Sequence, residues 1–305
     1  MIPQSARRQA LVASGALLEA TGVAGARLLL RDEAAYPAPL LDLPDPPPYL
    51  FAIGDFDILA PPVVAVVGTR AATPYGERVT RELAGALARA GACIVSGLAR
   101  GIDATAHRAA LEAGGRTAAV LGTGIDVAYP RANSALHAAI AGRGLLLSEH
   151  GPGERATAGS FPRRNRVIAA LAGVTIVVEA GARSGALITA GHALDLGRTV
   201  AAVPGPIDAP QSAGSNELLR DGAVVIASVA DAVALAGLTP PAARPGPHVE
   251  GDELVVWEAL ATGPADMDAL ASRTALPARR CLAAVTALEV AGSVECALTG
   301  EIRRR

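Results

Sequence analysis

The sequence predicts an α/β fold: an extended Rossmann-like, doubly wound and mostly parallel sheet, followed by a small C-terminal winged-helix domain. From Val63 onward, short apolar runs ending in glycine or polar residues alternate with Ala-, Leu- and Arg-rich segments of helical length. Continuous apolar strands are typical of a parallel sheet that helices cover on both faces. A Pro-rich segment near residue 240 separates this pattern from a second, shorter helical one.

The strands and helices alternate in a regular order. The apolar runs are VVAVVG, CIVSG, TAAVLG, GLLLSE, VTIVVEA and RTVAAVPG. The helices expected between them span residues 75–90, 101–113, 131–142, 163–172 and 184–196. Because this alternation builds βαβ units, we expect one Rossmann-like domain over residues 50–237.

Residues 1–49 are expected to form a short N-terminal helical segment. Within residues 1–60, two apolar helical patterns are followed by the Pro-rich passage YPAPLLDLPDPPPYLFAIGD, which is expected to be extended or looped. Arg7 and Arg8 precede an apolar stretch, as in a signal peptide, but Glu19 ends that stretch too early. No apolar run approaches the length of a membrane span, so we expect no membrane contact.

The C-terminal part begins with a Pro-rich linker over residues 238–251. Residues 252–305 contain three helical patterns and a hairpin that turns at Thr299-Gly300, which is the winged variant of helix-turn-helix. Arg279 and Arg280 would lie at the start of the third helix, the end that usually enters a DNA groove. Winged helices also mediate protein contacts, so a DNA role for this domain stays open.

The composition limits the kind of anion site that the chain can build. Its 305 residues carry a formal net charge of -2, and all 27 basic residues are arginine. Any anion site must therefore use guanidinium groups and backbone N–H groups. The 3 cysteines form no C-x-x-C pair, which argues against disulfides and zinc and favours a cytoplasmic location.

The strand ends lack the motifs of common cofactor sites and catalytic centres. The segment at Gly68-Thr69-Arg70 has neither a P-loop ending nor G-x-G-x-x-G, and the segment GTG at 122–124 continues differently from a dinucleotide fingerprint. The 5 histidines show no metal-ligand spacing. Asp103 and His107 lie one helical turn apart, a pair more typical of a helix dipole contact than of acid–base chemistry. Glu179 could be an active-site carboxylate or could cap a loop. We expect no cofactor, no metal and no catalytic residue.

What remains at the strand ends is typical of a site that holds phosphates without cleaving them. Arginines cluster in FPRRNR, while Ser184 and Gly185 open a helix whose free N–H groups favour an anion. Asn216 opens another helix. Phe161 and Tyr75 add aromatic faces on which bases could stack, in a chain with only 3% aromatic residues.

Taken in order, the motifs of residues 50–237 resemble those of the DprA/Smf family, DNA-processing protein A. They are GTR at 68–70, SGLARGIDATAH, GTGIDVAYP, FPRRNRVIA, EAGARSGALITA, VPGPI and GSN at 214–216. The resemblance implies a homodimer that binds single-stranded DNA without cutting it, protects incoming strands in natural transformation and helps to load the recombinase RecA. By motif, the implied DNA-binding residues are Arg70, Phe161, Arg163, Arg164, Asn165 and Arg166, with Arg183, Ser184 and Gly185 at the edge.

The chain departs from the family pattern in two places. Many members have a fuller N-terminal helical domain, for which residues 1–45 are short. The loop motif reads Ser184-Gly185-Ala186 where Ser-Gly-Ser is expected, so the hydroxyl of the last serine is missing.

Two other classes of protein compete with the DNA-binding interpretation. A nucleoside-monophosphate phosphoribohydrolase would need P-G-G-x-G-T-x-x-E, for which Glu179 is the only stand-in. A protein–protein adaptor would leave the arginines unexplained.

Overall fold

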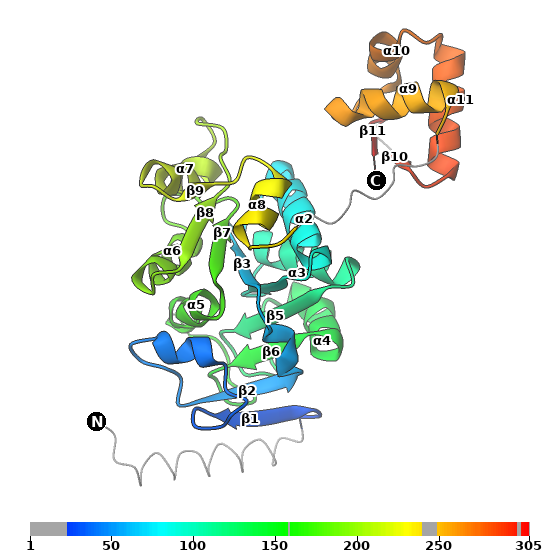
Figure 1. Ribbon diagram of the computed structural model, residues 1–305. Coiled ribbons are helices and arrows are strands. Elements are labelled where there is room, and N and C mark those ends of the chain that lie inside the picture. Colours follow the sequence, from blue (N-terminus) through cyan, green and yellow to red (C-terminus); the bar gives the residue numbers. More distant parts are fainter. Residues whose placement is uncertain (1–22, 158, 240–248, 298–299, 305) are drawn as a thin grey trace. The chain divides into compact units, whose positions relative to one another are not determined.

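The chain forms two compact units, residues 1–241 and 242–305, which are described separately. The computed structural model describes residues 23–157, 159–239, 249–297 and 300–304 (Figure 1). The division falls within the Pro-rich segment that the sequence predicts as a linker, most of which lies outside the described residues.

The first unit is built on a nine-stranded sheet with the order β1-β2-β6-β5-β4-β3-β7-β8-β9. Neighbours from β6 to β9 run parallel, whereas β2 pairs antiparallel with both β1 and β6. The strands are β1 (Ala26–Leu30), β2 (Tyr49–Gly54), β3 (Val63–Val67), β4 (Cys93–Ser96), β5 (Arg116–Leu121), β6 (Leu145–Ser148), β7 (Val174–Val177), β8 (Thr199–Ala202) and β9 (Val224–Val225). The predicted mostly parallel, doubly wound sheet is confirmed.

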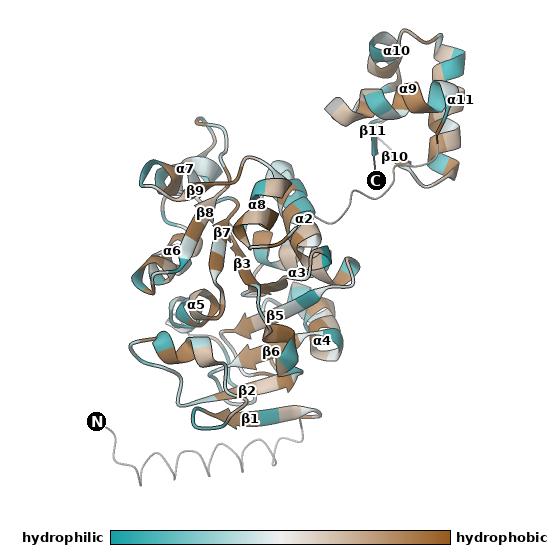
Figure 2. Cartoon of the chain, viewed as in Figure 1, coloured by the Kyte–Doolittle hydropathy of each residue, from teal (hydrophilic) through white to brown (hydrophobic). Residues whose placement is uncertain are grey.

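Helices cover both faces of this sheet, and successive residues of one strand explain why. In β3, Val64 and Val66 pack toward α2, α3 and α8, while Val63, Ala65 and Val67 pack toward α5 and α6. A strand buried on both faces must be apolar at every position, as Figure 2 shows by the brown central strands. The helices are α2 (Pro74–Arg89), α3 (Ile102–Glu112), α4 (Ser134–Arg143), α5 (Ser160–Leu171), α6 (Gly185–Asp195), α7 (Ala213–Arg220) and α8 (Val229–Leu235).

The helical prediction for the N-terminal segment is wrong where the structure describes it. Ala26–Leu30 is strand β1, and the Pro-rich passage contains the 3-10 helix η1 (Ala38–Asp42) and the whole of strand β2. Leu40 and Leu50 are fully buried in the same core as β3. Residues 23–49 therefore belong to the sheet domain. The first of the two expected helical patterns, within residues 1–22, lies outside the described residues.

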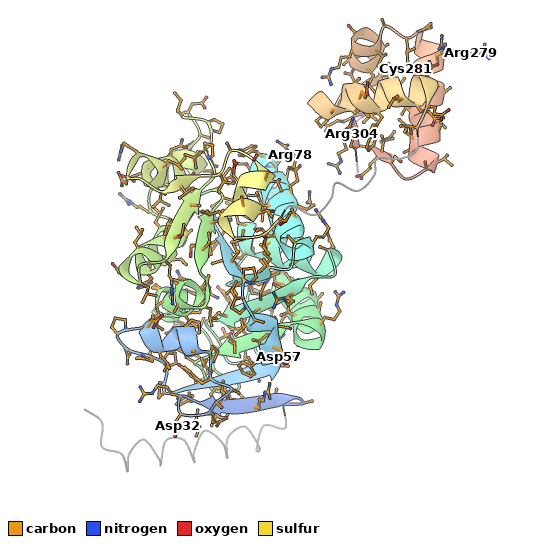
Figure 3. All side chains as sticks on the ribbon, viewed as in Figure 1. Asp32, Asp57, Arg78, Arg279, Cys281 and Arg304 are labelled. Atoms are coloured by element: carbon orange, nitrogen blue, oxygen red, sulfur yellow. The ribbon has the colours of Figure 1, made fainter. Side chains whose placement is uncertain are left out.

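The second unit has its own core and the predicted winged-helix architecture. It contains α9 (Gly251–Ala259), α10 (Met267–Thr274), α11 (Ala278–Val290) and the hairpin β10 (Val294–Cys296) with β11 (Ile302–Arg304). Arg280 is held by Asp252 at 2.6 Å through Nε, whereas Arg279 is exposed at the start of α11 (Figure 3). Of the two arginines expected to face a DNA groove, Arg280 therefore pairs with a carboxylate of its own unit.

Candidate nucleic-acid interface

A cavity of about 670 Å³ opens at the carboxyl ends of β3 and β7. β3 lies between β4 and β7, so the order of strands reverses there. Such a switch point is where open α/β sheets bind ligands. Most of the expected site residues line this cavity: Arg70, Phe161, Arg164, Asn165, Arg183, Ser184 and Gly185. Arg163 and Arg166 do not.

The loop after β3 brings Arg70 to the cavity. Gly68 allows this loop to pass close to α3 and β7, since a Cβ there would lie 2.5 Å from the Ile102 side chain and 2.8 Å from the Glu179 carbonyl. Arg70 is exposed, and its guanidinium carbon lies 5.1 Å from the centroid of the Phe161 ring. This cation–π contact orients the guanidinium while leaving its N–H groups available.

Phe161 is the second residue of α5 and forms an aromatic wall of the cavity. Its ring lies 5.3 Å from that of Tyr129, which is 49% exposed. Gly122, at the end of β5, makes room for the ring, because a Cβ there would lie 2.9 Å from the Phe161 Cδ1. The role of Gly122 and the position of Tyr129 were not predicted from the sequence, although both lie in GTGIDVAYP.

Arg164 lines the cavity but is only 5% exposed, so its main contacts are internal. Its Nη1 donates to the carbonyls of Gly97, at 2.6 Å, and Val120, and its Nε donates to Asn165 Oδ1 at 3.3 Å. Burial lowers the pKa of Arg164 to about 10, partly offset by the negative charge of Asp103. The guanidinium stays charged at neutral pH and fastens α5 to the ends of β4 and β5.

The other two arginines of FPRRNR pair with one carboxylate. Arg166 Nη2 lies 2.6 Å from Glu149 Oε2, and Arg163 Nη2 lies 3.6 Å from the same oxygen. Burial raises the pKa of Glu149, and both arginines oppose that rise. Arg166 is therefore engaged within the fold, whereas the side chain of Arg163 remains 60% exposed.

The start of α6 faces the cavity from the β7 side. The Ser184 hydroxyl accepts from the Ala186 N–H at 3.3 Å, as an N-cap does. Asn165 Nδ2 donates to the Gly185 carbonyl at 3.1 Å and so ties α5 to α6. Arg183 is exposed beside this helix end. An arginine and a helix N-terminus on one wall form a surface that favours an anion.

Glu179 has a structural role rather than a place in the cavity. Its Oε1 accepts from the Thr73 hydroxyl and its Oε2 from the Thr73 N–H at 3.0 Å, so it caps the start of α2. It is 3% exposed and does not line the cavity. The phosphoribohydrolase alternative relied on Glu179 as the carboxylate beside a phosphate, and this geometry does not support it.

Three further side chains of interest hold the fold. Tyr75 donates its hydroxyl to the Pro204 carbonyl at 3.0 Å and does not line the cavity, contrary to the expectation of an aromatic face there. The Asn216 amide contacts the Gly205 N–H and carbonyl, at 3.1 and 3.0 Å. Asp103 is buried at the start of α3, where its Oδ2 accepts from the Gly97 N–H at 3.2 Å.

His107 does not pair with Asp103. Its Nδ1 lies 2.7 Å from the Thr117 Oγ1, and the Thr117 hydroxyl donates to the Ile94 carbonyl at 2.8 Å. The single hydroxyl proton is thereby used, so His107 donates from Nδ1. Burial, followed by the charge of Arg164, lowers the pKa of His107 to about 3.

The part of the chain that the structure describes shows neither a metal-binding cluster nor a membrane-spanning helix. Within that part, no group of three or more His, Cys, Asp or Glu side chains is placed to hold a metal ion. Among the same residues, none of the helices has the length and apolar character that crossing a bilayer requires.

The fold and the cavity define a class of protein: a Rossmann-like domain whose switch point presents an aromatic ring, exposed arginines and a helix N-terminus, followed by a winged-helix unit. The family model of DNA recombination-mediator protein A matches residues 27–237, and that of the DprA winged helix domain matches residues 240–297. The chain belongs to the DNA recombination-mediator protein A family, the DprA/Smf family that its motifs resemble.

Relatives and solved structures agree with this assignment. The chain is 46% identical over 260 residues to the DprA protein of Mycobacterium tuberculosis. The alignment covers 82% of this chain and 67% of the relative. The structure of DNA processing protein A from Streptococcus pneumoniae superposes with a TM-score of 0.67 at 43% identity, over 70% of this chain and 76% of that one. The structure of DNA processing protein A from Helicobacter pylori, which is described with a single-stranded DNA binding mode, superposes with a TM-score of 0.61 at 34% identity. The superposition covers 68% of this chain and 93% of that one.

Proposed function

We propose that this chain binds single-stranded DNA, with one or more bases and phosphates in the cavity at the end of β3 and β7. The observation that carries the proposal is the contact between Arg70 and Phe161, 5.1 Å from guanidinium carbon to ring centroid, inside a cavity of about 670 Å³. An aromatic face can stack on an unpaired base, whereas bases in a duplex are already stacked on each other. Single strands are therefore preferred over duplex.

The phosphates would be held by the groups that stay free at the cavity. Arg70 and Arg183 are exposed, and α6 presents its N-terminus at Ser184 and Gly185. Arg164 and Asn165 position α5 between the strand ends and α6. The DNA-binding role of Arg163 and Arg166 is retained in a weaker form, since both pair with Glu149 and only Arg163 remains well exposed.

The test compares oligo-dT with a duplex of the same length by fluorescence anisotropy. We expect the full chain to prefer the single strand and Phe161→Ala to weaken that binding by about 1–3 kcal/mol. Leu194→Ala, at an exposed position on the last turn of α6, is the control. Equal or stronger binding of the duplex would contradict the proposal.

Membership of the family extends the proposal beyond DNA binding. We infer that the protein acts in the cytoplasm on strands taken up in natural transformation, protects them, and helps RecA to assemble on them, as a homodimer. Light scattering tests the dimer, because a monomer at micromolar concentration with intact DNA binding would contradict it. RecA filament assembly on single strands, followed with and without this protein, tests the loading step.

The proposal is binding without catalysis. It is supported by the engagement of both Glu179 oxygens with Thr73. We expect no release of base from nucleoside monophosphates and no turnover of ATP. Activity that Glu179→Gln abolishes would favour the phosphoribohydrolase alternative instead.

A further inference from the structure

The carboxyl edge of the sheet carries a row of exposed arginines that extends beyond the cavity. Each of four neighbouring strands, β3, β4, β5 and β6, is followed by one of them. They are Arg70, Arg100, Arg131 and Arg155. Among the described residues, none of the four has a carboxylate oxygen within salt-bridge distance. By contrast, Arg164 donates to backbone carbonyls and Arg166 pairs with Glu149, so both of these arginines stabilise the fold.

Acidic side chains on the same loops do not neutralise this row. Asp126 accepts through Oδ1 from the Gly153 N–H at 2.8 Å, and Glu154 accepts through Oε1 from the Gly151 N–H at 2.9 Å. Glu154 Oε2 also lies 3.2 Å from His150 Nδ1. These carboxylates are used to shape the loops, so the arginines present positive charge to the solvent.

The loops that carry the four arginines are joined to one another. The Ile102 N–H donates to the Thr69 carbonyl at 3.2 Å, which joins the β4 loop to the β3 loop. Asn133 Nδ2 donates to the Leu98 carbonyl at 2.9 Å, which joins the β5 segment to the β4 loop. The Gly124 N–H donates to the Glu154 carbonyl at 2.8 Å and joins the β5 and β6 segments. The loops that carry the row are therefore joined into one surface.

An aromatic face continues the cavity toward this row. Tyr129 lies outside the cavity lining, 49% exposed, and its ring is 5.3 Å from Phe161 with an interplanar angle of 31°. It precedes Arg131 by two residues. The base next to one stacked on Phe161 would therefore meet the Tyr129 ring, and Arg131 on the same segment offers a positive charge for a phosphate.

We propose that the single strand held in the cavity continues across the carboxyl edge of the sheet from β3 to β6, where Arg100, Arg131 and Arg155 contact successive phosphates and Tyr129 stacks on a base. This inference rests on the proposed function. Neighbouring strands are about 4.8 Å apart, so three intervals span about 14 Å. At about 3.4 Å per nucleotide in a stacked strand, that distance corresponds to roughly four nucleotides.

The test is the salt dependence of oligo-dT binding by the full chain and by the triple variant Arg100→Ala/Arg131→Ala/Arg155→Ala. Loss of three phosphate contacts reduces the slope of log affinity against log salt by about 2. Between 50 and 200 mM salt, the unchanged protein then loses about 20-fold more affinity than the variant. The matched control is Arg81→Ala/Arg89→Ala/Arg143→Ala, which removes the same charge from exposed positions on α2 and α4.

Tyr129 is tested separately from the charges. Tyr129→Ala should lose about 5- to 150-fold in affinity with an unchanged salt slope, and Tyr129→Phe should retain binding because the ring remains. Photocross-linking from single 5-iododeoxyuridine positions should label Tyr129 from a nucleotide adjacent to the one that labels Phe161.

Three results would overturn the inference. Equal salt slopes for the triple variant and the unchanged protein would remove the arginine contacts while leaving the cavity proposal intact. Labelling of Phe161 without labelling of Tyr129 from any position would remove the stacking site. Absence of binding by the unchanged protein would overturn the proposed function together with this extension of it.

Discussion

Arg164 donates from Nη1 to the Gly97 carbonyl at 2.6 Å, and this contact makes Arg164 part of the fold as much as of the site. The same group donates to the Val120 carbonyl, so one guanidinium satisfies two buried strand ends. Gly97 is required at this point, since a Cβ there would lie 2.4 Å from Arg164 Nη2. Arg70, by contrast, is exposed and lies over the Phe161 ring.

Arg164→Ala should therefore destabilise the protein. It removes the guanidinium donor from two buried carbonyls, at about 1–3 kcal/mol each, so the free energy of unfolding should fall by roughly 2–6 kcal/mol. Urea denaturation measures this change. Arg70→Ala is the control and should leave the free energy of unfolding within about 0.5 kcal/mol, as surface changes usually do. Equal stability of both variants would contradict the structural role of Arg164.

Arg70→Lys should weaken binding of single-stranded DNA although it keeps the charge. A lysine ammonium offers neither the planar surface that lies over Phe161 nor two parallel N–H groups for a phosphate. Anisotropy with oligo-dT measures the effect. Affinity equal to that of the unchanged protein would mean that Arg70 acts only as a point charge.

Gly122→Ala should weaken DNA binding by displacing Phe161. The added Cβ would lie 2.9 Å from Phe161 Cδ1, so the ring must move from its position in the cavity. We expect a loss that approaches the roughly 1–3 kcal/mol of a deleted stacking contact. Gly159→Ala is the matched control, because among the described residues no atom beyond its chain neighbours lies within 4 Å of a Cβ there. If both variants bind equally well, Gly122 does not position the ring.

Mild acid should destabilise the protein through His107. Its pKa is about 3 in the folded chain against 6.5 ordinarily, so between these values the unfolded chain binds a proton that the folded chain does not. Stability is therefore lost as pH falls below about 6.5, by up to about 1.4 kcal/mol per pH unit. Unfolding in urea at pH 7.5 and 5.5 measures this loss, which should be smaller in His107→Gln. An identical loss in both proteins would contradict it.

Most of the sheet could be predicted because β3 to β8 are apolar at nearly every position and are separated by helices. Residues 26–30, ARLLL, could not, since leucine and arginine favour helices and only pairing with β2 makes this segment a strand. The buried state of Arg164 had a signal that the prediction did not use. Positions 164, 167, 168 and 171 share one helical face, and the other three are apolar.

The contacts that select among the site residues depend on tertiary structure. The ion pair between Arg166 and Glu149 joins residues 17 positions apart, one on α5 and one directly after β6, so no helical spacing predicts it. Likewise the engagement of Glu179 by Thr73 joins residues 106 positions apart. The motifs could therefore indicate which residues gather at the switch point, but not which of them remain free to bind.

The most direct test of the account is a salt titration of oligo-dT binding by the unchanged protein, Arg70→Ala and Phe161→Ala. If DNA binds at this cavity, Arg70→Ala weakens binding and lowers the slope of log affinity against log salt by about 0.7, which is one phosphate contact on a single strand. Phe161→Ala should lose about 1–3 kcal/mol with its slope nearly unchanged. Unchanged affinity and slope in both variants would contradict DNA binding at this cavity.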